Sequence, residues 1–118
     1  MNININSAQK SIIDNCLLDL SDSSSIKSSS FLPKALESLL HSQGFGIEMS
    51  GIYISTDNDP KNIPDYLIEG IAFEFMDSHV TSPFREAILY MLEWYNHHGD
   101  IRNKKLDNIF EDLKEKFL

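Results

Sequence analysis

The spacing of the apolar residues changes twice along this chain of 118 residues. Up to residue 40 the apolar side chains recur at the intervals of helices that have one buried face. Between residues 46 and 75 they follow the pattern of short strands, and from residue 84 the helical interval returns. A chain with this pattern must bury a sheet from its middle third against helices from both ends.

Two helices are predicted in the first third. The first spans residues 8–20, and the second begins near Ser30, with Pro33 in its first turn and Gly44 as its C-terminal stop. Between them lie residues 21–30, of which seven are serine, so we expect a flexible connector there.

Two more helices are predicted in the last third. Ser82 is placed to cap the third helix, with Pro83 at its first position, and Gly99 is placed to end it. Asp100 is the predicted cap of the last helix. The apolar stripe of that helix contains Ile109, Phe110, Leu113 and Phe117.

The middle third predicts a small antiparallel sheet. Residues 46–54 and 67–75 are the expected strands, residues 55–66 are a loop, and residues 79–81 are a short third strand after a turn at Asp77-Ser78. The predicted order is α-α-β-β-(β)-α-α, so the class is α+β with two to three strands. A sheet this small is stable only if its Ile71, Phe73 and Phe75 face packs on the helices.

The whole chain, residues 1–118, has the length of a single domain that can bury a core without disulfides or metals. It contains one cysteine, Cys16, and no apolar run long enough to cross a bilayer. The first six residues lack the basic and apolar regions of a signal peptide. These features predict a cytoplasmic protein.

Negative charge is concentrated between residues 45 and 80. Seven acids and one base, Lys61, lie there, so this segment carries 7 − 1 = 6 of the net eight negative charges. A local negative field attracts a cationic partner and repels nucleic acid, so we expect a protein partner and no direct binding of DNA or RNA. The alternative is that these acids form only the solvated face of the sheet.

No residue pattern supports catalysis or a cofactor. The stretch from Asp57 to Asn62 begins like a calcium loop, but it lacks the glycine and the final acid that such a loop requires. Cys16 lies on an apolar helix stripe, and His97 and His98 point in different directions on a helix. The sequence contains no nucleotide-binding or hydrolase motif. We therefore expect a binding protein that is not an enzyme and needs no metal.

The predicted contact surface consists of the acids of this segment and two tyrosines close to them in sequence. Aromatic side chains among charges are typical of protein interfaces. The predicted contact residues are Glu48, Tyr53, Asp57, Asp59, Asp65, Tyr66, Glu69, Glu74 and Asp77.

The central block also resembles a known family. The residues that carry the resemblance are Gly44-Phe45-Gly46-Ile47, Ser50-Gly51-Ile52-Tyr53-Ile54 and Glu69-Gly70-Ile71-Ala72-Phe73-Glu74. They are similar to the immunity proteins of contact-dependent growth inhibition systems, in the group that guards against ribonuclease toxins. The resemblance implies a small cytoplasmic protein that binds the C-terminal toxin domain of a large bacterial surface effector and blocks it.

Two other functions are compatible with the sequence. The first is a non-enzymatic adaptor or chaperone-like subunit of a bacterial assembly, which would use the same acidic surface without a toxic partner. The second is a small enzyme or metal-dependent regulator that uses Asp57, Asp59 and nearby histidines.

Overall fold

The structure is a computed structural model that describes residues 6–21 and 31–118. Its elements, in chain order, are α1 (Ser7–Ser21), α2 (Leu32–Leu40), β1 (Phe45–Gly46), β2 (Ser50–Ile54), β3 (Ile71–Phe75), β4 (Ser78–Ser82), α3 (Phe84–Asn96) and α4 (Lys104–Phe117). Two short 3₁₀ turns, η1 (Pro60–Asn62) and η2 (Gly99–Ile101), lie in the connections. The predicted α+β class is confirmed, with four strands in place of two or three.

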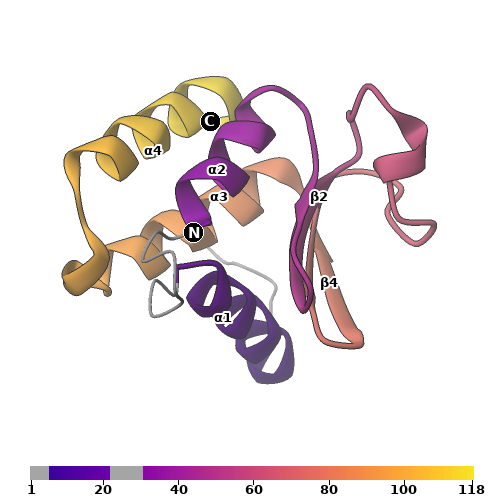
Figure 1. Ribbon diagram of the computed structural model, residues 1–118, viewed down its shortest axis with the longest axis horizontal. Helices are drawn as coiled ribbons and strands as arrows, with labels where there is room; N and C mark the ends of the chain where they lie inside the picture. The colour runs from indigo at the N-terminus through magenta and orange to yellow at the C-terminus, as the bar shows by residue number, and fades with distance from the viewer. Residues whose placement is uncertain (1–5, 22–30) are drawn as a thin grey trace.

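The four strands form one antiparallel sheet in the order β1-β2-β3-β4. Ile52, Phe73 and Val80 lie side by side in this register and are buried. Figure 1 shows the helices on one side of the sheet and the segment between β2 and β3 on the other. The sheet therefore has an inner face toward the helices and an outer face that they leave uncovered.

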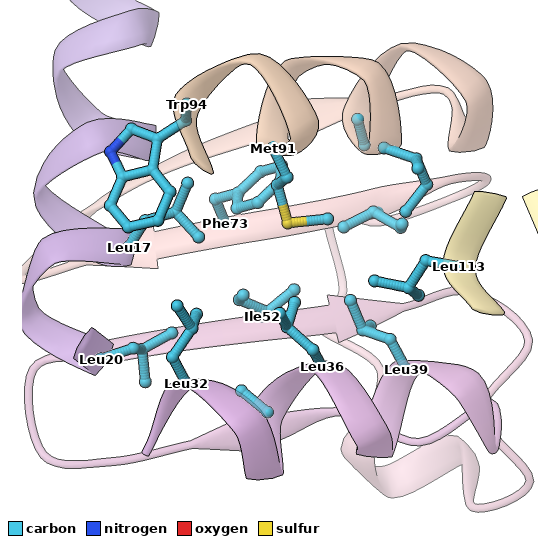
Figure 2. Packing of buried hydrophobic residues seen from close by; sticks show 14 of the residues in the cluster. Leu17, Leu20, Leu32, Leu36, Leu39, Ile52, Phe73, Met91, Trp94 and Leu113 are labelled. Carbon is cyan, nitrogen blue, oxygen red and sulfur yellow. The ribbon is translucent and has the colours of Figure 1, made fainter. Parts of the chain in front are cut away.

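The core lies between the inner face and the helices. Figure 2 shows Ile52 and Phe73 of the sheet among side chains from all four helices, including Leu17, Leu36 and Met91. The predicted sheet face is confirmed, because Ile71 and Phe73 are fully buried and Phe75 packs against the same cluster. Burying such side chains contributes roughly 1.5–3 kcal/mol each.

The strand boundaries differ from the prediction at both ends of the sheet. The single strand predicted over residues 46–54 is a hairpin of β1 and β2, closed where Ile47 N–H donates to the Ser50 carbonyl at 2.8 Å. β3 begins at Ile71, later than predicted, and the turn after it is Met76-Asp77. Pairing with β3 extends the short last strand to five residues. The first and last residues of each strand are determined by hydrogen bonds to the neighbouring strands, and the periodicity of the sequence alone does not predict them.

Four helix ends also differ from the prediction. α2 ends at Leu40, and Ser42, with φ of 55°, takes the left-handed conformation that was expected of Gly44. Ser82 is the last residue of β4, so Pro83 occupies the cap position of α3. Asn103, and not Asp100, caps α4, since its side chain accepts a hydrogen bond from Leu106 N–H. α3 ends at Asn96, and Gly99, which was expected to end it, is the first residue of η2.

The predicted connector and the Ser30 cap lie outside the described residues, apart from Ser21, which ends α1. In the described part of the chain, no helix has the length and hydrophobicity needed to span a membrane.

Candidate protein-binding surface

The structure separates the predicted contact residues into three places. Glu48 and Asp77 lie in the two turns at one end of the sheet, which we call the tip end (residues 47–49 and 76–77). The segment between β2 and β3, residues 55–70, forms the loop end, and it contains Asp57, Asp59, Asp65 and Glu69. Tyr53 and Glu74 lie on the outer face between the two ends, and Tyr66 reaches that face from the loop.

Asp57 is a structural residue of the loop end. It is only 8% exposed, and both of its carboxylate oxygens accept hydrogen bonds from the backbone. Gly44 N–H donates to one oxygen at 2.7 Å and Asp59 N–H to the other at 2.8 Å. Because these bonds tie the loop to the start of the sheet, we do not assign Asp57 a place in the contact surface.

The other acids of the loop end are exposed. Asp59 accepts a hydrogen bond from Lys61 N–H and caps η1, which leaves its second oxygen without a partner among the described residues. Asp65 and Glu69 are on the surface, and between them Ile68 is 91% exposed. A large apolar side chain between free carboxylates is a combination that folding does not require.

A polar aromatic cluster occupies the outer face. The Tyr66 hydroxyl donates to a Glu74 carboxylate oxygen at 2.5 Å, and the Tyr66 ring stacks on the His79 ring with 3.7 Å between centroids. Glu74 and His79 are directly opposite each other on β3 and β4. Burial and the hydrogen bond to Glu74 raise the pKa of Tyr66, so the phenol stays protonated as the donor. This cluster holds the loop against the sheet, and sequence reasoning did not place His79 in it.

Tyr53 lies flat against the neighbouring backbone. A Cβ atom added at Gly44, Gly46 or Gly51 would come within 2.8 Å of the Tyr53 side chain. Gly46 and Gly51 are paired across β1 and β2, so the ring covers a position where the sheet has no side chains of its own. The occurrence of Gly51 two residues before Tyr53 therefore has a packing explanation in this fold.

Gly70 is a second glycine that the fold requires. Its φ is +108°, and a Cβ atom there would overlap the carbonyl oxygen of Ser82. Its N–H donates to the Ser55 hydroxyl oxygen at 3.0 Å, which closes the base of the loop. Each of the three segments that carry the family resemblance thus contains a glycine at a position where close packing or backbone geometry restricts the residue type.

The tip end contains two methionines that sequence reasoning missed. Met76 N–H donates to the Met49 carbonyl at 2.7 Å, which joins the two turns, and the side chains are 66% and 47% exposed. Each methionine is a neighbour in sequence of an acid, Glu48 or Asp77, and both acids lack a hydrogen-bond or ion-pair partner among the described residues. One feature of the sequence could have revealed this site. Met76 lies in a two-residue turn between strands, where glycine or asparagine is usual.

The ion pairs of the described residues all lie among the helices and their connections. They join Arg102 to Asp107, Lys105 to Glu37, and Lys114 to Glu111, with separations of 3.2 to 3.6 Å. None includes an acid from residues 45–80, so the negative field of this segment is not neutralised by salt bridges within the described chain.

His97, His98 and Cys16 each make a hydrogen bond to a backbone carbonyl. The Nδ1 atoms of His97 and His98 bond the Glu93 and Trp94 carbonyls, so these rings cover the end of α3. Among the described residues, no three His, Cys, Asp or Glu side chains are grouped to hold a metal ion. Burial raises the pKa of the Cys16 thiol to about 12, and the thiol donates to the Gly51 carbonyl at 3.4 Å. A thiol in this state is a poor nucleophile.

The chain matches no family model, and no curated protein or solved structure is significantly similar to it. The family resemblance therefore remains a prediction that rests on the residues quoted above.

Proposed function

We propose that this chain is an immunity protein that binds and neutralises the toxin domain of a contact-dependent inhibition effector. The observation that carries the proposal is the uncompensated charge of residues 45–80, a net of 7 − 1 = 6 negative charges with no ion pair among the described residues. The expected partner is a basic ribonuclease domain, since an enzyme that holds RNA phosphates has a cationic active-site surface.

The proposed contact surface keeps most of the predicted residues. It consists of the exposed acids at both ends of the sheet together with the polar cluster of the outer face. Its members are Glu48, Asp59, Asp65, Tyr66, Glu69, Glu74 and Asp77. Asp57 stabilises the loop through its hydrogen bonds, and Tyr53 packs on the glycines of β1 and β2. Carboxylates in these positions take the place of RNA phosphates on the toxin and steer its approach.

The proposal places the protein in the cytoplasm, where a ribonuclease toxin acts, and needs no cofactor. The carboxylates are arranged on a sheet whose backbone is held by its own hydrogen bonds and core. A surface prepared in this way loses little conformational freedom when the toxin binds, which favours a tight complex.

Co-expression tests the proposal. An immunity gene is expected directly after its toxin gene, so the coding sequence immediately upstream supplies the candidate toxin domain. We expect that domain to stop growth when expressed alone, to be harmless with this protein, and to copurify with it in a complex whose association slows as salt is added. A harmless domain, or one that never associates, would instead favour the adaptor function.

A further inference from the structure

We infer that the tip end is an anchoring site for a basic segment of the partner that carries apolar side chains along one face. This inference rests on the proposed function and adds a second kind of contact to it. The tip patch consists of Glu48, Met49, Met76 and Asp77. Residues distant in sequence come together there through the hydrogen bond from Met76 N–H to the Met49 carbonyl.

The backbone at Met76 is the first sign that this turn is not optimised for folding alone. Its φ of 56° lies in the left-handed region, which a long side chain adopts at a cost. Met76 is the first of two residues between the paired Phe75 and Ser78, a position that favours glycine in such turns. A strained residue that is also apolar and 66% exposed gains nothing from the fold, which points to a role outside it.

The surface beside the patch is hollow and partly apolar. The residues that line a groove of about 520 Å³ there include Met49, Leu18, Phe75 and Ile101. Leu18 is 45% exposed, so the apolar surface continues from the turns onto α1. Methionine side chains are flexible and adapt to different partners. Met49 in the wall of the groove and Met76 in the adjoining turn, which bonds the Met49 carbonyl, therefore suit a docking site.

The charges around the groove select the occupant. Asp19 and Asp100 line it, and no Lys or Arg is among the described residues that form its walls. Glu48 precedes the lining residue Met49 in sequence, and Asp77 follows the lining residue Phe75 by two positions. An apolar groove with an acidic rim is complementary to a segment that has leucine-like side chains on one face and Lys or Arg on the other. A basic toxin domain is a source of such a segment.

Methyl NMR of the full chain, labelled at methionine Cε, tests the site with a synthetic peptide of leucine and lysine at helical spacing. We expect the Met49 and Met76 signals to shift saturably, while Met91, which is fully buried in the core, stays constant as an internal control. A peptide with glutamate in place of lysine, and one with alanine in place of leucine, should each shift neither signal. Equal shifts with all three peptides, or none with any, would overturn the inference.

Met76→Gly separates binding from folding. Glycine tolerates the left-handed conformation, so we expect a Tm no lower than that of the wild type, with the peptide bound about tenfold more weakly. Leu118→Gly is the matched control, since it removes a 44% exposed apolar side chain from the C-terminal end of the chain and should leave peptide binding unchanged. Equal affinity for the wild type and Met76→Gly contradicts the site, and so does a concentration-dependent dimer whose contact covers Met49 and Met76.

The same variants distinguish this inference from the proposed function. If the upstream toxin domain binds both the wild type and Met76→Gly equally, the proposed function stands and the tip site is wrong. If the toxin domain does not bind at all, but the leucine–lysine peptide still shifts Met49 and Met76, the tip site stands and the immunity function is wrong.

Discussion

The loop end and the tip end of the sheet both carry negative charge, but their carboxylates differ in whether they accept hydrogen bonds from the protein itself. At the loop end, Asp57 and Asp59 accept hydrogen bonds from backbone N–H groups, so part of the negative charge stabilises the chain itself. At the tip end, Glu48 and Asp77 have no such partners among the described residues and are flanked by exposed methionines. The comparison shows that a cluster of acids in sequence can contain both structural and free carboxylates.

The two ends also differ in the type of residue that adopts the left-handed backbone conformation. Near the loop end the left-handed position is occupied by glycine, Gly70, which adopts it without strain. At the tip end it is occupied by Met76, which does not. The loop end is therefore built for stability, and the tip end gives up some stability for an exposed side chain.

Gly70→Ala should have the largest effect on stability, because Gly70 lies at the base of the loop end, where the backbone is closely packed. The new Cβ would overlap the Ser82 carbonyl oxygen, and φ of +108° is strained for alanine. We expect the free energy of unfolding to fall by about 3–5 kcal/mol, measured by urea denaturation. Gly99→Ala is the control, since its Cβ meets no atom within 4 Å and should change stability by less than about 0.5 kcal/mol. Similar values for the two variants would show that the close packing of Gly70 on β4 is wrong.

Asp57→Ala should be next in size. It leaves the N–H groups of Gly44 and Asp59 without their acceptor in a partly buried site, which costs about 1–3 kcal/mol. Asp65→Ala removes an exposed carboxylate from the same loop and should leave the Tm almost unchanged. If Asp65→Ala is the more destabilising of the two, the division into structural and free carboxylates fails.

The pH dependence of stability tests whether the Cys16 thiol is buried between α1 and β2. There the thiol donates a hydrogen bond to the carbonyl of Gly51, near the tip end of the strand. The unfolded thiol ionises near pH 9.0, whereas burial keeps the folded thiol protonated up to about 12. In that window the unfolded state binds fewer protons, so stability is intact below pH 9 and falls as pH rises, by up to about 1.4 kcal/mol per unit. Denaturant unfolding between pH 8 and 10 measures this slope.

Cys16→Ala provides the comparison for the pH series. It should lose some stability at every pH because it removes buried volume, but its curve should be flatter than that of the wild type between pH 9 and 10. Parallel curves would mean that the thiol is not buried as described.

Paired neutral substitutions should give the smallest effects and compare the two ends directly. Glu48→Gln with Asp77→Asn removes the tip carboxylates, and Asp59→Asn with Asp65→Asn removes two from the loop while asparagine retains the cap of η1. We expect each pair to slow association with the toxin domain several-fold at low salt, as measured by surface plasmon resonance.

The matched control is Asp112→Asn with Glu115→Gln, two exposed acids of α4. It should leave the association rate near that of the wild type. If the control pair slows association as much as the others, the partner responds to net charge alone, and neither end is a specific contact.

The helices and the fold class were predictable because each helix carries a continuous apolar stripe. Leu36 and Leu39 of α2 are buried as the helical interval requires, and so are Ile109 and Phe110 of α4. The helix caps were less predictable. Ser82 has the side chain of a cap but is used by β4, and Asn103 caps α4 three residues later than Asp100 would have done.

The candidate site was predictable in composition and not in arrangement. Local charge is a property of residue order, so the acidic segment was visible from the start. Whether a carboxylate is free depends on which N–H groups lie within hydrogen-bond distance of it, and Gly44, the partner of Asp57, is 13 residues away. Met49 and Met76 likewise become neighbours only because β2 and β3 pair in one register.

Residue order determines that the first and last thirds of this chain are helical, that the middle third forms strands, and that negative charge is concentrated there. It does so because periodicity and charge are local properties. The fourth strand, the structural role of Asp57, and the tip patch arise only in the folded chain. Each depends on hydrogen bonds between segments distant in sequence, and such bonds are specified by the register of the sheet and the packing of its inner face on the helices.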